Sequence, residues 1–454
     1  MRGRRCTARG RVRAGRGRPP LSVRGGALTA VSAVVVALGL GGVPVGQEAA
    51  AAPGAASGTP RPYAFAEGAR TVDGALSTAD AVRLEIGPAH RSTLPSNGRV
   101  HYSLELDAAS NAYVSATAVP PAGGTGSVSD GIKVSLKDDD GRSCDADTAT
   151  FGAARSPHPL AASAVREIAS TRSLCQQPGT YYLTVERADP DGAGSSPGPW
   201  ELELTAVTEP PLEGTAATEE PEDWDSASPA PVAGEPRRRA GGAGFARATT
   251  LGEGAWRDDI RPGQTLFYRV PVDWGGRIHA TAELGSSRSG GRGFVPAALD
   301  LDLYNPVRGR VTDLGIGYDG NQKSDGLDPL PPVAHANRHA VSSRVKAMRF
   351  AGSYYLVAHL AAGVADDFGD GPVGLTLRIR VGGAAQSGPR YAGEPVPAEV
   401  FTVTEEDRET AAGGDAADDR TAMTALAVGG IGTGSALLVG LGVWTVLARR
   451  RAVP

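Results

Sequence analysis

The stretch Pro178-Gly179-Thr180-Tyr181-Tyr182-Leu183 recurs later in the chain as Ala351-Gly352-Ser353-Tyr354-Tyr355-Leu356. In both copies a glycine turn leads into a run in which alternate side chains are apolar, which is the pattern of a half-buried β-strand. Strand parity places Tyr181 and Tyr354 on the inward side, so we expect both rings to pack in a core. The tyrosine that follows each of them points to the opposite face.

The alternating runs around this motif also repeat, and in the same order. Three further pairs match: Tyr102–Leu106 with Tyr268–Val272, Ile132–Leu136 with Leu299–Leu303, and Trp200–Leu204 with Leu375–Ile379. The offset is 166 residues between Tyr102 and Tyr268 and 173 between Tyr181 and Tyr354, so it grows slowly along the chain. Such growth indicates one duplicated unit with longer loops in the second copy. The sequence therefore predicts an all-β chain with two antiparallel β-sandwich domains in tandem, at 76–208 and 247–382.

These residues resemble a known family. A tyrosine-containing strand, the run Leu299-Asp300-Leu301-Asp302-Leu303-Tyr304 with a turn at Arg308-Gly309, the Gly-Ser-Tyr-Tyr-Leu strand and a closing strand are similar to the bacterial pre-peptidase C-terminal (PPC) domain. The resemblance implies jelly-roll-like sandwiches of the kind found on secreted enzymes and surface proteins, some of which bind collagen or calcium. The first copy reads Val134-Ser135-Leu136-Lys137-Asp138 and lacks the first aspartate pair, so this binding role is not carried over to it.

The beginning of the chain has the pattern of an export signal. Residues 1–24 hold nine arginines and no acid, Gly25 to Gly46 carries no charge, and Ala49–Ala52 is a run of small residues. A basic region, an apolar region and an A-x-A site are typical of a secretory signal peptide. We expect a signal peptide at 1–51 and a disordered segment at 52–75; an uncleaved anchor is the alternative.

Near the other end, Thr421 to Ala448 is a stretch of 28 residues without a charge. A helix needs about 20 residues to cross a bilayer. Three arginines, Arg449–Arg451, follow it, and positive charge favours the cytoplasmic side. The sequence predicts a transmembrane helix at 421–448 with a cytoplasmic tail at 449–454, that is, a single-pass type I membrane protein with an extracellular ectodomain. A buried globular helix is the alternative.

Two stretches lack the apolar residues needed to fold alone. The Pro- and acid-rich segment 209–246 and the Ala-, Gly- and acid-rich segment 383–420 are expected to be a linker and a juxtamembrane spacer. The net charge is −4, but without the 12 terminal arginines 34 bases remain against 50 acids, a balance of −16. An acidic middle argues against nucleic acid as a partner.

The sequence offers little catalytic chemistry. It holds no Gly-x-Ser-x-Gly, HExxH or Walker motif, so we predict a protein that is not an enzyme, with no catalytic residue and no cofactor. Asp300 and Asp302 share one face of a strand and are weak candidates for calcium, which takes six to eight oxygen ligands. His335 and His339 are four apart, but Pro331-Pro332 precedes them, so we expect a solvated surface loop there.

Cys144 and Cys175 are the two cysteines left after removal of the signal peptide. Export places them in an oxidising compartment, so we expect a disulfide; two buried free thiols are the alternative.

The whole pattern predicts a non-catalytic, membrane-anchored extracellular binding or adhesion module that recognises a protein or a cell-wall polysaccharide. The alternatives are a scaffold subunit of a membrane or secretion complex, and a hydrolase whose residues meet only in the fold.

Overall fold

The computed structural model of the chain describes residues 62–412 except 97, 122, 124–125, 190–197, 215–220, 222 and 231. All of these belong to the unit Ala56–Pro454. The predicted signal peptide at 1–51, transmembrane helix at 421–448 and cytoplasmic tail at 449–454 lie outside the described residues. Within the described ranges, no helix combines the length and the apolar character needed to cross a membrane.

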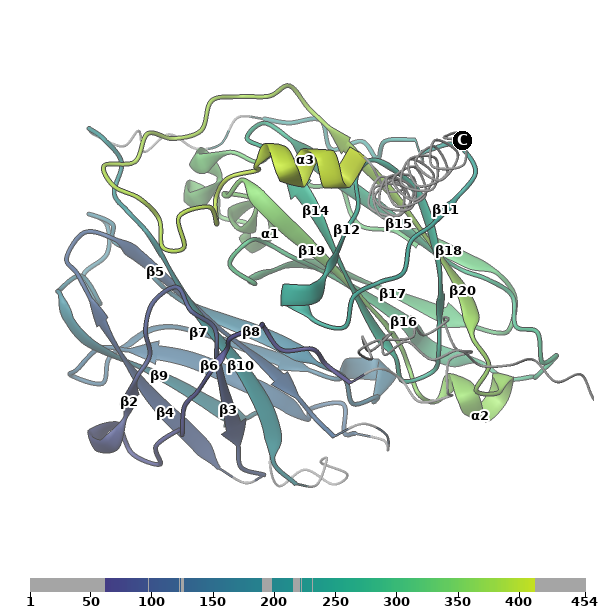
Figure 1. Cartoon of the computed structure of the whole chain (residues 1–454), viewed down its shortest axis with the longest axis horizontal. Coiled ribbons are helices and arrows are strands. Elements are labelled where there is room, and N and C mark those ends of the chain that lie inside the picture. Colours follow the sequence, from purple (N-terminus) through teal and green to yellow (C-terminus); the bar gives the residue numbers. More distant parts are fainter. Residues whose placement is uncertain are drawn as a thin grey trace, which may run out of the picture. The chain divides into compact units, whose positions relative to one another are not determined.

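The first sandwich consists of two five-stranded sheets packed face to face (Figure 1). Their strand orders are β1-β3-β10-β5-β8 and β2-β4-β9-β6-β7. The strands are β1 Arg70–Thr71, β2 Val82–Arg83, β3 His90–Leu94, β4 Arg99–Leu106, β5 Asn111–Val119, β6 Gly131–Lys137, β7 Ser143–Thr150, β8 Leu160–Arg166, β9 Gly179–Arg187 and β10 Trp200–Glu209. Short 3₁₀ turns occupy Thr78–Asp80 and Gly152–Ala154.

The second sandwich has sheets of order β11-β13-β20-β15-β18 and β12-β14-β19-β16-β17. The strands are β11 Arg237–Arg238, β12 Thr249–Thr250, β13 Gly254–Ile260, β14 Thr265–Val272, β15 Arg277–Leu284, β16 Val295–Tyr304, β17 Arg310–Tyr318, β18 Lys323–Gly326, β19 Gly352–Leu360 and β20 Val373–Gly382. Its helices are α1 Ser343–Ala347, α2 Val364–Phe368, α3 Glu405–Ala412 and the 3₁₀ helices Phe245–Arg247 and His335–His339.

The two sandwiches match strand for strand, as the position of the Tyr-Tyr motif shows. It lies on β9 and on β19, which take the same place between neighbours in their sheets, β4-β9-β6 and β14-β19-β16. Tyr181 and Tyr354 are buried in the two cores, as strand parity predicts, with 2% and 0% of their surface exposed. The prediction of a mostly β chain with two sandwiches in tandem is confirmed.

One feature of the sheets differs from the antiparallel pattern that we expected. Each sheet begins with a two-residue strand that pairs in parallel with its neighbour: β1 with β3, β2 with β4, β11 with β13 and β12 with β14. Two residues are too few to show an alternating pattern, so the sequence carries no period-two signal for these strands.

The second repeat begins inside the stretch that we expected to be a linker. β11 pairs with β13, and the Arg237 guanidinium lies 4.2 Å from the centroid of the Trp256 ring. Upstream, Arg378 on β20 donates a hydrogen bond to the carbonyl oxygen of Val232 at 3.0 Å. Arg277 on β15 donates to the carbonyl oxygen of Ala227 at 3.4 Å. Arg277 and Arg378, on neighbouring strands of the sheet β11-β13-β20-β15-β18, therefore hold the described part of this segment along the second sandwich.

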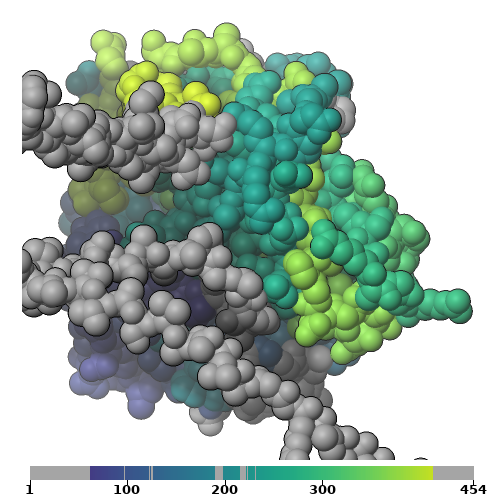
Figure 2. Space-filling model, turned by 45° about the vertical axis from the view of Figure 1, so that its right-hand side comes forward, coloured from purple at the N-terminus to yellow at the C-terminus, as the bar shows by residue number. Residues whose placement is uncertain are grey.

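The described part of the expected spacer, 383–412, also packs on the sandwiches. Phe401 and Val403 are buried, with 3% and 5% of their surface exposed, because these apolar side chains pack between and beside the sheets. Val396 forms a β-bridge to Thr208 near the end of β10, and Tyr391 forms one to Leu212, three residues beyond that strand. At the end of this segment, α3 lies on the second sandwich (yellow on teal, Figure 2), where Arg408 bonds Asp273 at 2.6 Å. Residues 413–420 lie outside the described residues.

Candidate functional site

The strand faces that point away from the two cores meet in an interface between the sandwiches. The outward sides of β5, β8 and β10 face those of β14, β16 and β19, and two apolar clusters fill the space between them. The clusters consist of Tyr113, Val207, Val307, Phe350 and Phe401, and of Ala161, Phe245, Phe267, Tyr304 and Val357. Tyr355, the outward tyrosine of the second motif, packs against the second cluster.

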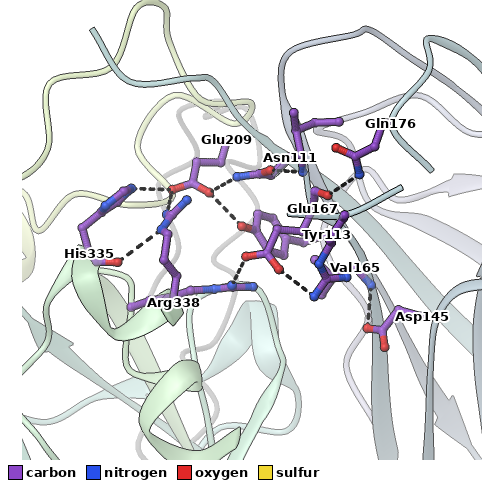
Figure 3. A network of polar contacts seen from close by, with 12 residues as sticks. Asn111, Tyr113, Asp145, Val165, Glu167, Gln176, Glu209, His335 and Arg338 are labelled. Carbon is purple, nitrogen blue, oxygen red and sulfur yellow. Dashed lines mark hydrogen bonds and ion pairs between the residues drawn. The ribbon is translucent and has the colours of Figure 1, made fainter. Parts of the chain in front are cut away.

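Glu209, the last residue of β10, is the centre of a polar network in this interface (Figure 3). Asn111 and Tyr113, both on β5, donate to its Oε2 at 2.9 and 2.7 Å. Arg338 of the second sandwich and Tyr391 of the C-terminal segment donate to its Oε1 at 2.6 and 2.9 Å. One carboxylate thus joins the first sandwich, the second sandwich and the segment that crosses both.

The charge of Glu209 is stable because its partners compensate for burial. The residue is fully buried, and burial by itself raises the pKa of a carboxyl group. The Arg338 charge and the hydrogen bonds from Asn111, Tyr113 and Arg338 outweigh that effect, so the pKa of Glu209 lies below its ordinary value. The carboxylate is ionised at neutral pH, and its negative charge is matched by the Arg338 guanidinium.

A second carboxylate of the same strand repeats this arrangement. Glu203 lies six residues before Glu209, on the same face of β10, and is also fully buried. Arg308 of the second sandwich donates to its Oε1 at 2.6 Å. The Tyr63 hydroxyl, at 3.2 Å, and the Ala66 amide, at 2.8 Å, donate to the same carboxylate. A third inter-sandwich pair, Arg349 with Glu167, has an N–O distance of 3.0 Å.

Asp300 and Asp302 line a cleft of about 310 Å³ between the sandwiches, together with Thr148 and His158 of the first sandwich. The Nε atom of Arg310 donates to Asp302 at 2.6 Å, so a protein cation already occupies the position beside this carboxylate. Among the described residues, no three His, Cys, Asp or Glu side chains are placed to hold a metal ion. Burial, and then the charge of Asp302, raises the pKa of Asp300 to about 7.

Cys144 and Cys175 form a disulfide, as predicted, with their Cα atoms 5.7 Å apart. Cys144 lies on β7, the edge strand of its sheet, and Cys175 lies in the loop that leads to β9. Arg166 donates to the carbonyl oxygen of Cys175 at 3.0 Å and fixes the same loop from the other side. The bridge therefore ties a long loop of the first sandwich to its edge.

His335 and His339 do not lie in the solvated loop that we expected. They begin and end a 3₁₀ helix, because the Asn337 side chain between them donates to the carbonyl oxygens of Pro332 and Met348, at 2.9 and 2.8 Å. The His335 side chain is only 18% exposed, and its Nε2 lies 3.8 Å from Oε1 of Glu209. Burial, and then the Arg338 charge, lowers the pKa of His335 to about 4, so the ring is neutral at physiological pH.

Next to this network, three hollows adjoin one another on the second sandwich. The central one, of about 350 Å³, is lined by Trp224, Trp274 and His335 among others. Trp274 also borders the second hollow, of about 420 Å³, and Trp224 borders the third, of about 280 Å³. This surface was not predicted, because Trp224 belongs to the Pro- and acid-rich segment that we expected to be a linker.

Comparison with known proteins adds little to this geometry. No protein-family model matches the chain, and no curated protein matches its sequence. Among solved structures, the chain is similar to the tandem CBM51 modules of a family 98 glycoside hydrolase from Streptococcus pneumoniae, with 7% identity, a TM-score of 0.17, and 64% of this chain and 84% of the other covered. It is also similar to the CBM22 tandem domain of a Paenibacillus barcinonensis protein, with 10% identity, a TM-score of 0.16 and coverage of 62% and 82%.

A third similar structure is tripeptidyl peptidase 2, with 10% identity, a TM-score of 0.22, and 73% of this chain and 28% of that chain covered. Scores this low leave the function of the chain to be argued from its own residues.

Proposed function

We propose that the protein is a non-catalytic binding protein, anchored in the cell membrane, whose two sandwiches recognise a protein or a cell-wall polysaccharide outside the cell. The observation that carries this proposal is that the buried carboxylates of β10 are paired with arginines. Glu203 and Glu209 each bind an arginine of the second sandwich, at 2.6 Å. Charges committed to ion pairs of this kind hold the domains together, and they are not available for acid–base work on a substrate.

The repeated strand order supports a jelly roll for each sandwich, related to the PPC domain that the sequence resembles. Without the short leading strands, the first sandwich has the order β3-β10-β5-β8 opposite β4-β9-β6-β7, and the second has the corresponding order. Two interleaved Greek keys on eight strands have this arrangement. Folds of this kind serve many functions, so the fold supports the binding role only together with the interface.

The disulfide supports an extracellular position, because such bonds persist mainly in oxidising compartments. The membrane anchor at 421–448 and the signal peptide at 1–51 belong to the same proposal. Protease added to intact, wall-stripped cells should remove the ectodomain and leave only the anchor with its short tail. Protection of residues 52–420 would overturn the proposed orientation.

Binding and turnover can be separated in one assay. Purified full-length protein is mixed with isolated cell walls and sedimented, and the supernatant is searched for released fragments by mass spectrometry. We expect the protein to sediment with the walls, or with a protein attached to them, and to release nothing. Release of fragments would instead favour the hydrolase alternative. Failure to sediment, with binding only to other membrane proteins, would favour the scaffold alternative.

A further inference from the structure

We infer that the three adjoining hollows on the second sandwich form a binding site for a linear, uncharged polysaccharide, an inference that rests on the proposed binding function. Trp224 lines both the central hollow and one neighbour, and Trp274 lines both the central hollow and the other neighbour. Three hollows that share an indole ring at each junction fit a ribbon-shaped ligand with a repeating unit. Pyranose rings offer such a ribbon, and their C–H faces pack against indole rings.

The two indoles differ from the other described tryptophans in their position. Trp200 and Trp256 are core residues with 0% and 2% of their surface exposed, whereas Trp224 and Trp274 are only partly buried. Both partly buried rings are held in place. The Arg277 guanidinium lies 5.1 Å from the centroid of the Trp224 ring. Gly388 packs so closely on Trp274 that a Cβ atom there would overlap the indole. Fixed aromatic surfaces lose little entropy when a ligand binds.

The charges around the hollows disfavour an anionic ligand. The two arginines that line the outer hollows are each paired with a carboxylate: Arg408 with Asp273 at 2.6 Å, and Arg344 with Asp328 at 2.7 Å. His335, in the central hollow, is neutral at physiological pH because its pKa is about 4. An anionic polymer would therefore find no unpaired cation among these lining residues, and like charges across an interface are strongly unfavourable.

Hydrogen-bonding chemistry separates a polysaccharide from the other ligand that aromatic grooves commonly bind, a proline-rich peptide. Asp223 in the central hollow and Glu253 in the second are exposed carboxylates, which only accept hydrogen bonds. Sugar hydroxyls can donate to them. A polyproline helix has no N–H group to offer, and its carbonyl oxygens would face these carboxylates. Exposed Gln386 and Ser387, beside the central hollow, can both donate and accept.

The test uses purified full-length protein and two soluble probes, cellohexaose and chitohexaose, titrated while tryptophan emission is recorded. We expect at least one probe to bind and to shift the emission, and its trisaccharide to bind more weakly because it spans fewer hollows. Trp224→Ala and Trp274→Ala should each weaken binding at least tenfold. The matched control is Phe294→Ala, which removes another exposed aromatic side chain of the same sandwich, 64% exposed, and should leave binding unchanged. Melting curves verify that the variants are folded.

The outcomes distinguish the inference from the function on which it rests. Undiminished saccharide binding in both tryptophan variants would overturn the location of the site and leave the binding function intact. Binding of a decaproline peptide in place of either hexasaccharide would overturn the ligand class. No response to any of these probes would overturn the inference, and sedimentation with cell walls would then decide separately whether the proposed function survives.

Discussion

Substitution of Glu209 by alanine should destabilise the whole ectodomain, because this carboxylate joins three segments of the chain. The change leaves the backbone pairing of β10 intact and removes only the side chain that accepts from Asn111, Tyr113, Arg338 and Tyr391. The Arg338 guanidinium, whose side chain is 12% exposed, would then be buried without its counter-ion.

The expected magnitude follows from that geometry. Removing one partner of a buried ion pair lowers the free energy of unfolding by about 3–5 kcal/mol, since the remaining charge is not compensated. Glu201→Ala is the matched control, on the same face of the same strand. Glu201 pairs with Arg91, and the two side chains are 48% and 47% exposed. A pair this exposed contributes about 0–1 kcal/mol. Glu209→Gln keeps most of the volume and should fall between the two.

The assay is urea unfolding of the purified protein, followed by tryptophan fluorescence. We expect Glu209→Ala to lower the free energy of unfolding by at least about 2 kcal/mol more than Glu201→Ala, because the ranges for buried and exposed pairs differ by that amount. Equal losses for the two variants would refute the assignment of Glu209 as the joint between the sandwiches.

Three further predictions concern the bridge and two titrating groups. The double variant Cys144→Ser/Cys175→Ser should lose roughly 3–4 kcal/mol of unfolding free energy, the chain-entropy value for a separation of 31 residues, and a reductant should affect the native protein but not this variant. Because burial and the charge of Asp302 raise the pKa of Asp300 to about 7, ionisation removes stability as the pH rises from about 4 to about 7. Asp300→Asn should therefore be more stable than the native protein at pH 8 but not at pH 4, as measured by urea unfolding. Burial and Arg338 lower the pKa of His335 to about 4, so its contribution is lost as the pH falls from about 6.5 to 4, and His335→Gln should reduce this acid sensitivity in pH-dependent melting curves.

The internal repeat was predictable because both copies obey strand parity. Tyr181 and Tyr354 alternate with polar neighbours, and their burial follows from period two alone. The disulfide was predictable from cysteine number and compartment. These signals are local, or depend on a simple count, so a single sequence carries them.

The interface was not predictable in the same way. Alternation places Glu203 on the face opposite the core of its strand, but it does not reveal that a second domain covers this face. Glu209 is the first residue of the stretch that we expected to be a linker, so the sequence pattern did not place it on a strand. A weak signal exists in β5, where Asn111–Val119 is buried on both faces and alternation is replaced by mostly small and apolar side chains. The segments expected to be linker and spacer were misjudged because composition averages over a stretch. The few apolar side chains in 383–412, such as Phe401, determine where the segment packs.

The claim that the two sandwiches form one body is tested most directly by a distance distribution between them in solution. Nitroxide labels at Leu76→Cys and Phe294→Cys, positions that are 78% and 64% exposed, place one probe on each sandwich in full-length protein that also carries Cys6→Ser. Pulsed electron paramagnetic resonance should give a single narrow distribution, which Glu209→Ala broadens. A broad distribution in the protein with an intact Glu209, as expected for two domains on a flexible linker, would show that the sandwiches move independently.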